Sequence, residues 1–194
     1  CRFVELVRER AGPELDPERL RAEFQRRLDE AIARRIAKIR TGAVPPCAYL
    51  VHGAREFLEH VARAGLTPVI LSTTIQNRLS EEAELLGIAH HFGPHVYGGT
   101  GDPLRFSKRA VFERLRREEG VIGERLLSVG DGPIETRDTK DLGGIAIAVC
   151  SDEERNGSGV LDRRKRDQLF AAGADAAIPD FRAAASLLDF LLGR

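Results

Sequence analysis

The chain has 194 residues, which suits one domain or one core with a small additional lobe. Hydrophobic residues make up 42% of it and charged residues 31%, a balance typical of a folded globular protein. The 30 basic and 30 acidic side chains give a formal net charge of zero. This composition argues against nucleic acid or an anionic membrane as a partner.

The cysteines and the hydropathy of the chain indicate the cellular compartment in which we expect it. Cys1, Cys47 and Cys150 lie far apart and form no C-x-x-C pair, so free thiols in a reducing environment are expected. No run of 18 apolar residues occurs, which predicts no membrane-spanning helix. We therefore expect a cytoplasmic protein, and the sequence leaves its oligomeric state open.

The first predicted element is a long helix that begins at Asp16-Pro17-Glu18. Asp at the N-cap, Pro in the first turn and an acidic residue beside it are typical helix-start signals. Gly42 and then Pro45-Pro46 end the helix. Its single apolar face is predicted from residues that recur every three or four positions: Leu20, Phe24, Leu28, Ile32, Ile36 and Ile39. Residues 1–46 are expected to form a helical segment.

From Cys47 onward, short apolar runs alternate with amphipathic stretches, which predicts an α/β fold with a Rossmann-like parallel sheet flanked by helices. The strands are expected at residues 67–71, 95–97, 126–129, 144–149 and 174–178. The helices are expected near residues 54–64, 77–86, 107–119, 134–142, 163–172 and 181–192. Several of these helices are followed by a glycine, a common C-terminal signal.

The ends of the predicted strands carry the side chains that suggest chemistry. Ser72 and Thr73 follow the strand at 67–71, and Asp131 and Glu135 follow the strand at 126–129. Ligands of open parallel sheets bind at the carboxyl ends of the strands. Hydroxyls suit phosphoryl oxygens, carboxylates suit Mg²⁺, and Lys108 at a helix start adds a positive charge. The sequence therefore predicts a phosphate site beside a magnesium ion.

Each of these signals also has a simpler structural interpretation. Residues 72–74 are typical of a helix cap, and Gly130-Asp131-Gly132 is typical of a turn. Lys108 is one of several charged residues on an amphipathic helix and suits a solvated face. Their order along the chain, each beside a strand end or helix start, favours the phosphate interpretation over three unrelated local roles.

The same residues, in this order, resemble the motifs of the haloacid dehalogenase-like hydrolases. The second motif of that family is a Ser or Thr at a strand end, matched by Ser72. The third is a Lys before or within a helix, matched by Lys108. The fourth is an acidic pair after a strand, matched by Asp131 and Glu135 in Gly-Asp-Gly-Pro-Ile-Glu. The resemblance spans residues 47–194 and is greatest to a phosphoglycolate phosphatase-like group.

The resemblance implies a role for each matched residue. Ser72 would hydrogen-bond the transferring phosphoryl group, and Lys108 would neutralise its charge. Thr73, the next hydroxyl residue at this strand end, is expected to bind the phosphate with them. Asp131 would bind Mg²⁺, with Glu135 supporting the metal through water or orienting Asp131. Ser72 and Lys108 are thus the implied catalytic residues of this chain, and residues 1–46 would be part of a helical cap.

The first motif of the family, Asp-x-Asp-Gly-Thr, does not occur in this sequence. Its first Asp is the nucleophile in the family and its second is the general acid/base. Because the chain begins at Cys1 and contains no Met, a preceding segment is expected to carry this motif. Without that segment, the chain is expected to be catalytically inactive.

The resulting hypothesis is an Mg²⁺-dependent phosphomonoester hydrolase that acts on a small phosphorylated metabolite through an aspartyl-phosphate. Two alternatives remain open. One is a non-catalytic binding protein of the same fold. The other is a phosphomutase that transfers the phosphoryl group to a sugar rather than to water. The sequence does not identify the substrate.

Overall fold

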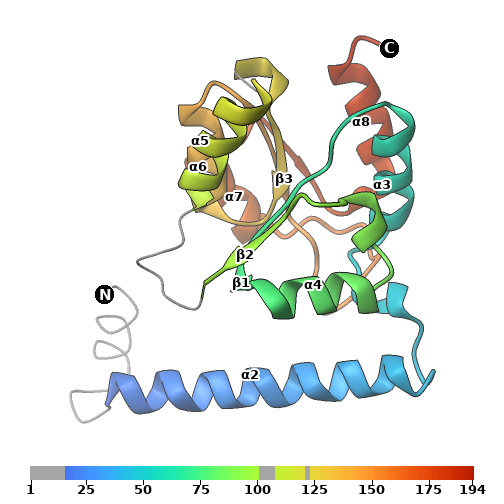
Figure 1. Cartoon of the computed structure of the whole chain (residues 1–194), viewed down its shortest axis with the longest axis vertical. Coiled ribbons are helices and arrows are strands. Elements are labelled where there is room, and N and C mark those ends of the chain that lie inside the picture. The colour runs from blue at the N-terminus through green and yellow to red at the C-terminus, as the bar shows by residue number, and fades with distance from the viewer. Residues whose placement is uncertain (1–15, 101–107, 121–122) are drawn as a thin grey trace. The chain divides into compact units, whose positions relative to one another are not determined.

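A computed structural model describes residues 16–100, 108–120 and 123–194 (Figure 1). The chain divides into two compact units, with the boundary between Pro45 and Pro46. Within the described residues, no helix combines the length and the apolar character that a membrane crossing requires.

The first unit contains the predicted long helix, α2 (Pro17–Arg40). Asp16 caps it as expected, since its carboxylate accepts a hydrogen bond from the Glu18 amide at 3.0 Å. On its polar side Arg26 pairs with Glu23, and Thr41 closes the C-terminal turn. Phe24, on the apolar face, is 64% exposed. The helix therefore follows from its own start and stop signals.

The second unit alternates strands and helices, which confirms the α/β prediction. Its strands are β1 (Ile70–Ile75), β2 (Val96–Gly99), β3 (Leu127–Gly130), β4 (Ile145–Val149) and β5 (Ala176–Ile178). Its α-helices are α3 (Ala54–Arg63), α4 (Gln76–Leu85), α5 (Lys108–Glu119), α6 (Pro133–Asp141), α7 (Arg163–Ala171) and α8 (Ala184–Leu191). Short 3₁₀ turns occupy Pro46–Tyr49, Ala89–His91, Gly123–Arg125 and Phe181–Ala183. Gly87 and Gly143 follow α4 and α6 with φ of +71° and +78°, as predicted for helix ends.

All strand pairs of the described residues are parallel, and they form two sheets. One sheet has the order β3-β4-β5, and the other consists of β1 and β2. Figure 1 shows α5, α6 and α7 on one side of β3 and α3 with α8 on the other. The prediction of parallel strands flanked by helices is therefore confirmed.

The core is built on both faces of β4. Ile147 and Val149 face a cluster that includes Phe57 of α3 and Leu188 of α8. Ala148, which points to the other face, and Cys150 after the strand belong to a second cluster with Leu169 of α7. Burial of both faces explains why the sequence of β4 is continuously apolar.

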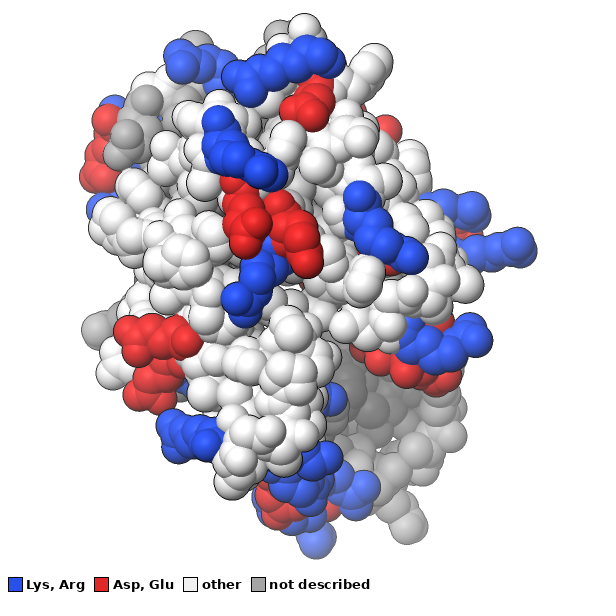
Figure 2. Space-filling model, turned by 90° about the vertical axis from the view of Figure 1, so that its right-hand side faces the viewer, with Lys and Arg blue, Asp and Glu red and all other residues white. Residues whose placement is uncertain are grey.

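Charges of both signs are mixed on the surface that Figure 2 shows. Lys and Arg lie beside Asp and Glu on this face, and neither sign forms one continuous region. The mixed charge on this face is what the balanced composition leads one to expect.

Candidate functional site

The hydroxyl residues lie inside β1 rather than after it. Leu71 pairs with Tyr97 and Ile75 pairs with Gly99, so β1 has two more residues than β2 between these positions. This irregularity is a bulge formed by residues 72–74, a feature that redirects side chains and is frequent beside active sites. The strand predicted at residues 67–71 is therefore observed further along the chain, at Ile70–Ile75.

Within the bulge, the hydroxyls of Ser72 and Thr73 have different surroundings. The Ser72 hydroxyl donates to Thr74 Oγ1 and accepts from the Thr74 amide, both at 3.1 Å. Thr73 is exposed and lines a pocket. The helix-cap interpretation of these residues is wrong, because Ile75 occupies the N-cap of α4 and no side chain caps that helix.

The acidic pair lies at the turn from β3 into α6. Asp131 follows the last residue of β3 and is exposed, and Gly132 is the N-cap of α6. Glu135, in the first turn of α6, folds its carboxylate back over Gly132. A Cβ at position 132 would lie 2.1 Å from Glu135 Oε1, so any larger residue would displace this carboxylate. Gly132 therefore leaves the space that the Glu135 carboxylate occupies.

Lys108 and Glu135 meet across α5 and α6. Lys108 Nζ lies 3.1 Å from Glu135 Oε2, and the two side chains are only 16% and 20% exposed. Both line a pocket of about 440 Å³ together with Thr73. The remaining lining residues are Gly132, Pro133, Ile134 and Asp138. The structure thus places three of the predicted site residues in one pocket, while Ser72 and Asp131 are chain neighbours of lining residues.

Asp138 is a pocket residue that the sequence reasoning missed. It lies three residues after Glu135, so both carboxylates occupy the same side of α6. Burial raises the pKa of Asp138, and Arg109, 3.8 Å away, opposes this increase. Arg109 also pairs with Asp141 at 3.1 Å. Helical spacing from Glu135 is the signal that could have identified Asp138.

The donor set suits Mg²⁺ only in part. Carboxylate oxygens are appropriate ligands, and Mg²⁺ is often held by one or two carboxylates together with waters and phosphate oxygens. Asp131 is exposed at the strand end and fits this pattern, whereas Glu135 already contacts Lys108. In the part of the chain that the structure describes, no three His, Cys, Asp or Glu side chains are grouped to hold a metal ion.

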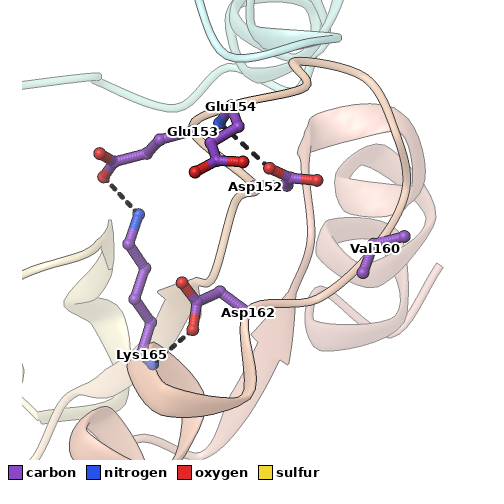
Figure 3. A pocket seen from close by; sticks show the side chains of 6 residues that line it. All are labelled: Asp152, Glu153, Glu154, Val160, Asp162 and Lys165. Carbon is purple, nitrogen blue, oxygen red and sulfur yellow. Dashed lines mark hydrogen bonds and ion pairs between the residues drawn. The ribbon is translucent and has the colours of Figure 1, made fainter.

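A second pocket, of about 380 Å³, is lined by the loop that connects β4 to α7 and by the first turn of α7 (Figure 3). Lys165 lies 2.6 Å from Glu153 Oε1, and the Asp152 carboxylate accepts from the Glu154 amide at 3.1 Å. Asp162 caps α7 by accepting from the amides of Arg164 and Lys165. These acidic residues shape their own loop and cap a helix, which is a sufficient structural role for them.

The family model for a haloacid dehalogenase-like hydrolase matches residues 5–136, more than half of the chain. The chain belongs to this family. The resemblance drawn from Ser72, Lys108, Asp131 and Glu135 is therefore confirmed at the level of the family.

A curated relative and two solved structures are similar to the chain. A phosphoserine phosphatase of Wolinella succinogenes is 30% identical over 118 residues, which are 53% of this chain and 57% of that protein. The chain thus spans little more than half the length of this relative.

The first solved structure is a conserved haloacid dehalogenase-like protein of unknown function from Agrobacterium tumefaciens. It has a TM-score of 0.70 and 17% identity, and the match covers 98% of this chain and 77% of that chain. The second is a predicted phosphoglycolate phosphatase from Haemophilus somnus, with a TM-score of 0.62 and 16% identity. That match covers 95% of this chain and 73% of the other. At these identities, the similarity shows a common fold.

Proposed function

We propose that this protein is a phosphomonoester hydrolase that acts on a small phosphorylated metabolite. The observation that carries the proposal is the pocket that Thr73, Lys108 and Glu135 line beside the carboxyl ends of β1 and β3. A hydroxyl and an ammonium group are the donors that a phosphoryl group requires. Phosphoryl transfer depends mainly on positioning and on charge stabilisation, which such groups provide.

The chain's own residues would bind and orient the phosphoryl group. The hydroxyl of Thr73 would donate a hydrogen bond to a phosphoryl oxygen, and Ser72 would be a second donor once its hydroxyl exchanges Thr74 Oγ1 for the phosphate. Lys108 would exchange its contact with Glu135 for the phosphate and neutralise part of the negative charge. Because Glu135 already holds the Lys108 ammonium group near the pocket, little rearrangement would be needed.

Asp131 would hold Mg²⁺, with Glu135 supporting the metal through water or orienting Asp131. When bound, Mg²⁺ would supply positive charge to the phosphoryl oxygens.

The nucleophile would come from a strand outside the described residues. Among the described strands, β1 pairs with β2 and β3 pairs with β4, so β1 and β3 each have a further edge available for pairing. A carboxylate carried there would attack phosphorus and release the alcohol, and water would then cleave the resulting aspartyl-phosphate.

Phosphate binding tests this proposal on the chain as it is. The probe is inorganic phosphate with MgCl₂, followed by amide chemical shifts of Thr73, Lys108 and Gly132. We expect saturable shifts at these amides and about tenfold weaker binding in Lys108→Met, since a charge-assisted hydrogen bond is lost. Lys165→Met removes the cation that pairs with Glu153 in the other pocket and should leave the affinity unchanged. No shifts, or equal affinity in Lys108→Met, would contradict the proposal.

A further inference from the structure

Gln76 ties the start of α4 to β2. Its side-chain amide accepts a hydrogen bond from the Gly98 amide at 2.6 Å and donates to the Val96 carbonyl at 3.1 Å. It also donates to the Ser80 hydroxyl one turn further along α4, at 3.2 Å. The two β2 groups flank Tyr97, and a residue of a neighbouring parallel strand uses the same pair of backbone groups. The Gln76 side chain therefore acts as a ladder partner for β2.

The backbone packs tightly where Gln76 makes these bonds. A Cβ at Gly98 would lie 2.6 Å from Gln76 Cα, and a Cβ at Gly99 would lie 2.7 Å from the Thr73 carbonyl oxygen. Both neighbours are backbone atoms, which cannot move aside without shifting the bulge. The two glycines therefore permit the close approach, and Gln76 holds it in place.

These contacts fix both ends of the bulge. Before it, Leu71 pairs with Tyr97, and after it Gln76 binds the groups on either side of the same Tyr97. The two extra residues of β1 are therefore confined between two contacts with β2, and the bulge has to project from the strand there. Thr73 lies in this span and lines the pocket.

We propose that Gln76 is a positioning residue that fixes the β1 bulge and thereby presents the Thr73 hydroxyl to the pocket. The phosphate-binding part of this inference rests on the proposed function. Gln76 does not line the pocket, so it would act on a ligand only through the conformation of residues 72–74.

The local test measures amide hydrogen exchange in Gln76→Ala and Gln76→Glu. In Gln76→Ala we expect exchange at Gly98 to accelerate about tenfold, because its acceptor is lost. The Thr74 amide, which donates to Ser72 inside the bulge, should accelerate with it. Gln76→Glu keeps an acceptor for Gly98 but loses the donor to Val96, so an intermediate effect is expected. Gln168→Ala, an exposed position on α7, is the matched control and should change neither amide.

The functional test measures the affinity of the same variants for inorganic phosphate and their melting temperatures. We expect Gln76→Ala to bind phosphate about fivefold to tenfold more weakly, with partial rescue in Gln76→Glu and a nearly unchanged melting temperature. A merely structural contact would lower the melting temperature without a selective loss of affinity.

The outcomes separate this inference from the proposed function. If the wild-type chain binds phosphate and Gln76→Ala binds it equally well, the positioning role is overturned while the proposed function stands. If the wild-type chain does not bind phosphate, the proposed function fails. The amide exchange rates of Gly98 and Thr74 then test by themselves whether Gln76 fixes the bulge. Unchanged exchange at Thr74 in Gln76→Ala overturns the inference in either case.

Discussion

Two carboxylates with little exposure illustrate how two regions of the second unit differ. Asp180, after β5, is 3% exposed, and its carboxylate contacts the Arg182 guanidinium at 2.7 Å. This contact lowers the pKa of Asp180. Asp138, in the wall of the candidate pocket, has a raised pKa because burial outweighs the attraction of Arg109, 3.8 Å away. The contact with Arg182 thus favours the ionised form of Asp180, whereas burial disfavours the ionised form of Asp138.

The surrounding structure differs in the same way. Around β4 and β5, apolar side chains such as Leu188 and Leu169 are almost completely buried. Around β1 and the start of α6, Thr73 is exposed and Ile134 is 63% exposed. The three-stranded sheet thus carries most of the packing that the described residues show, whereas residues around the pocket are more exposed.

The largest expected effect tests the packed region. Leu188→Ala removes a side chain that is 2% exposed and packs in the cluster around Phe57 and Ile147. We expect the free energy of unfolding to fall by about 2–5 kcal/mol. Leu192→Ala, at a position that is 37% exposed, is the control and should cost less than about 1 kcal/mol. Urea denaturation measures both, and equal losses would remove the distinction between the two regions.

The next largest effect tests the ion pair between Asp180 and Arg182. Because the folded-state pKa of Asp180 is lowered, its ionised form stabilises the protein above the pKa of the unfolded chain. This contribution is lost as the pH falls through the folded-state value. Asp180→Asn should therefore cost about 1 kcal/mol at pH 7 and progressively less below about pH 4. Asp167→Asn, 68% exposed, is the control. A pH-independent loss in Asp180→Asn would contradict the ion-pair account.

The smallest effect is a gain in stability, which we expect when Asp138 is replaced by Asn. Because the folded-state pKa of Asp138 is raised, its ionised form costs stability, and the cost appears as the pH rises through that value. Asp138→Asn should therefore raise the free energy of unfolding at pH 7, by less than about 1 kcal/mol. The gain should vanish in acid.

Asp141→Asn is the matched control for Asp138→Asn, one turn further along α6. Asp141 is 59% exposed and also pairs with Arg109, so its replacement should bring no gain. If Asp138→Asn instead lowers the free energy of unfolding, the ionised form of Asp138 stabilises the fold as that of Asp180 does. The contrast between the two regions would then fail.

The parts of the fold that depend on local signals were predictable from the sequence. The capped start of α2, the apolar run of β4 and the glycines after α4 and α6 are each decided within a few neighbouring residues. The residues that line the pocket were identified in part for the same reason, since Lys108 and Glu135 lie at helix starts.

The remaining features depend on contacts between distant segments. The bulge in β1 is defined only by its pairing with β2, and Gln76 was not recognised because its partners are Val96 and Gly98. Thr is also a favourable strand residue, so β1 continues through positions at which the sequence suggested an end. The raised pKa of Asp138 results from the packing of α6 and was not accessible from spacing alone.

The most direct test of the central claim is hydrolysis of p-nitrophenyl phosphate by this chain joined to an upstream strand that ends in Asp-x-Asp-Gly-Thr. The account predicts release of p-nitrophenol that depends on Mg²⁺. It also predicts a loss of about 10²-fold or more in Lys108→Met and Asp131→Asn and full activity in Lys165→Met. In a separate assay with a sugar phosphate as substrate, an isomerised sugar phosphate in place of free phosphate would indicate a mutase. Absence of hydrolysis, or activity that Asp131→Asn leaves unchanged, would contradict the assignment of this pocket as a phosphatase site.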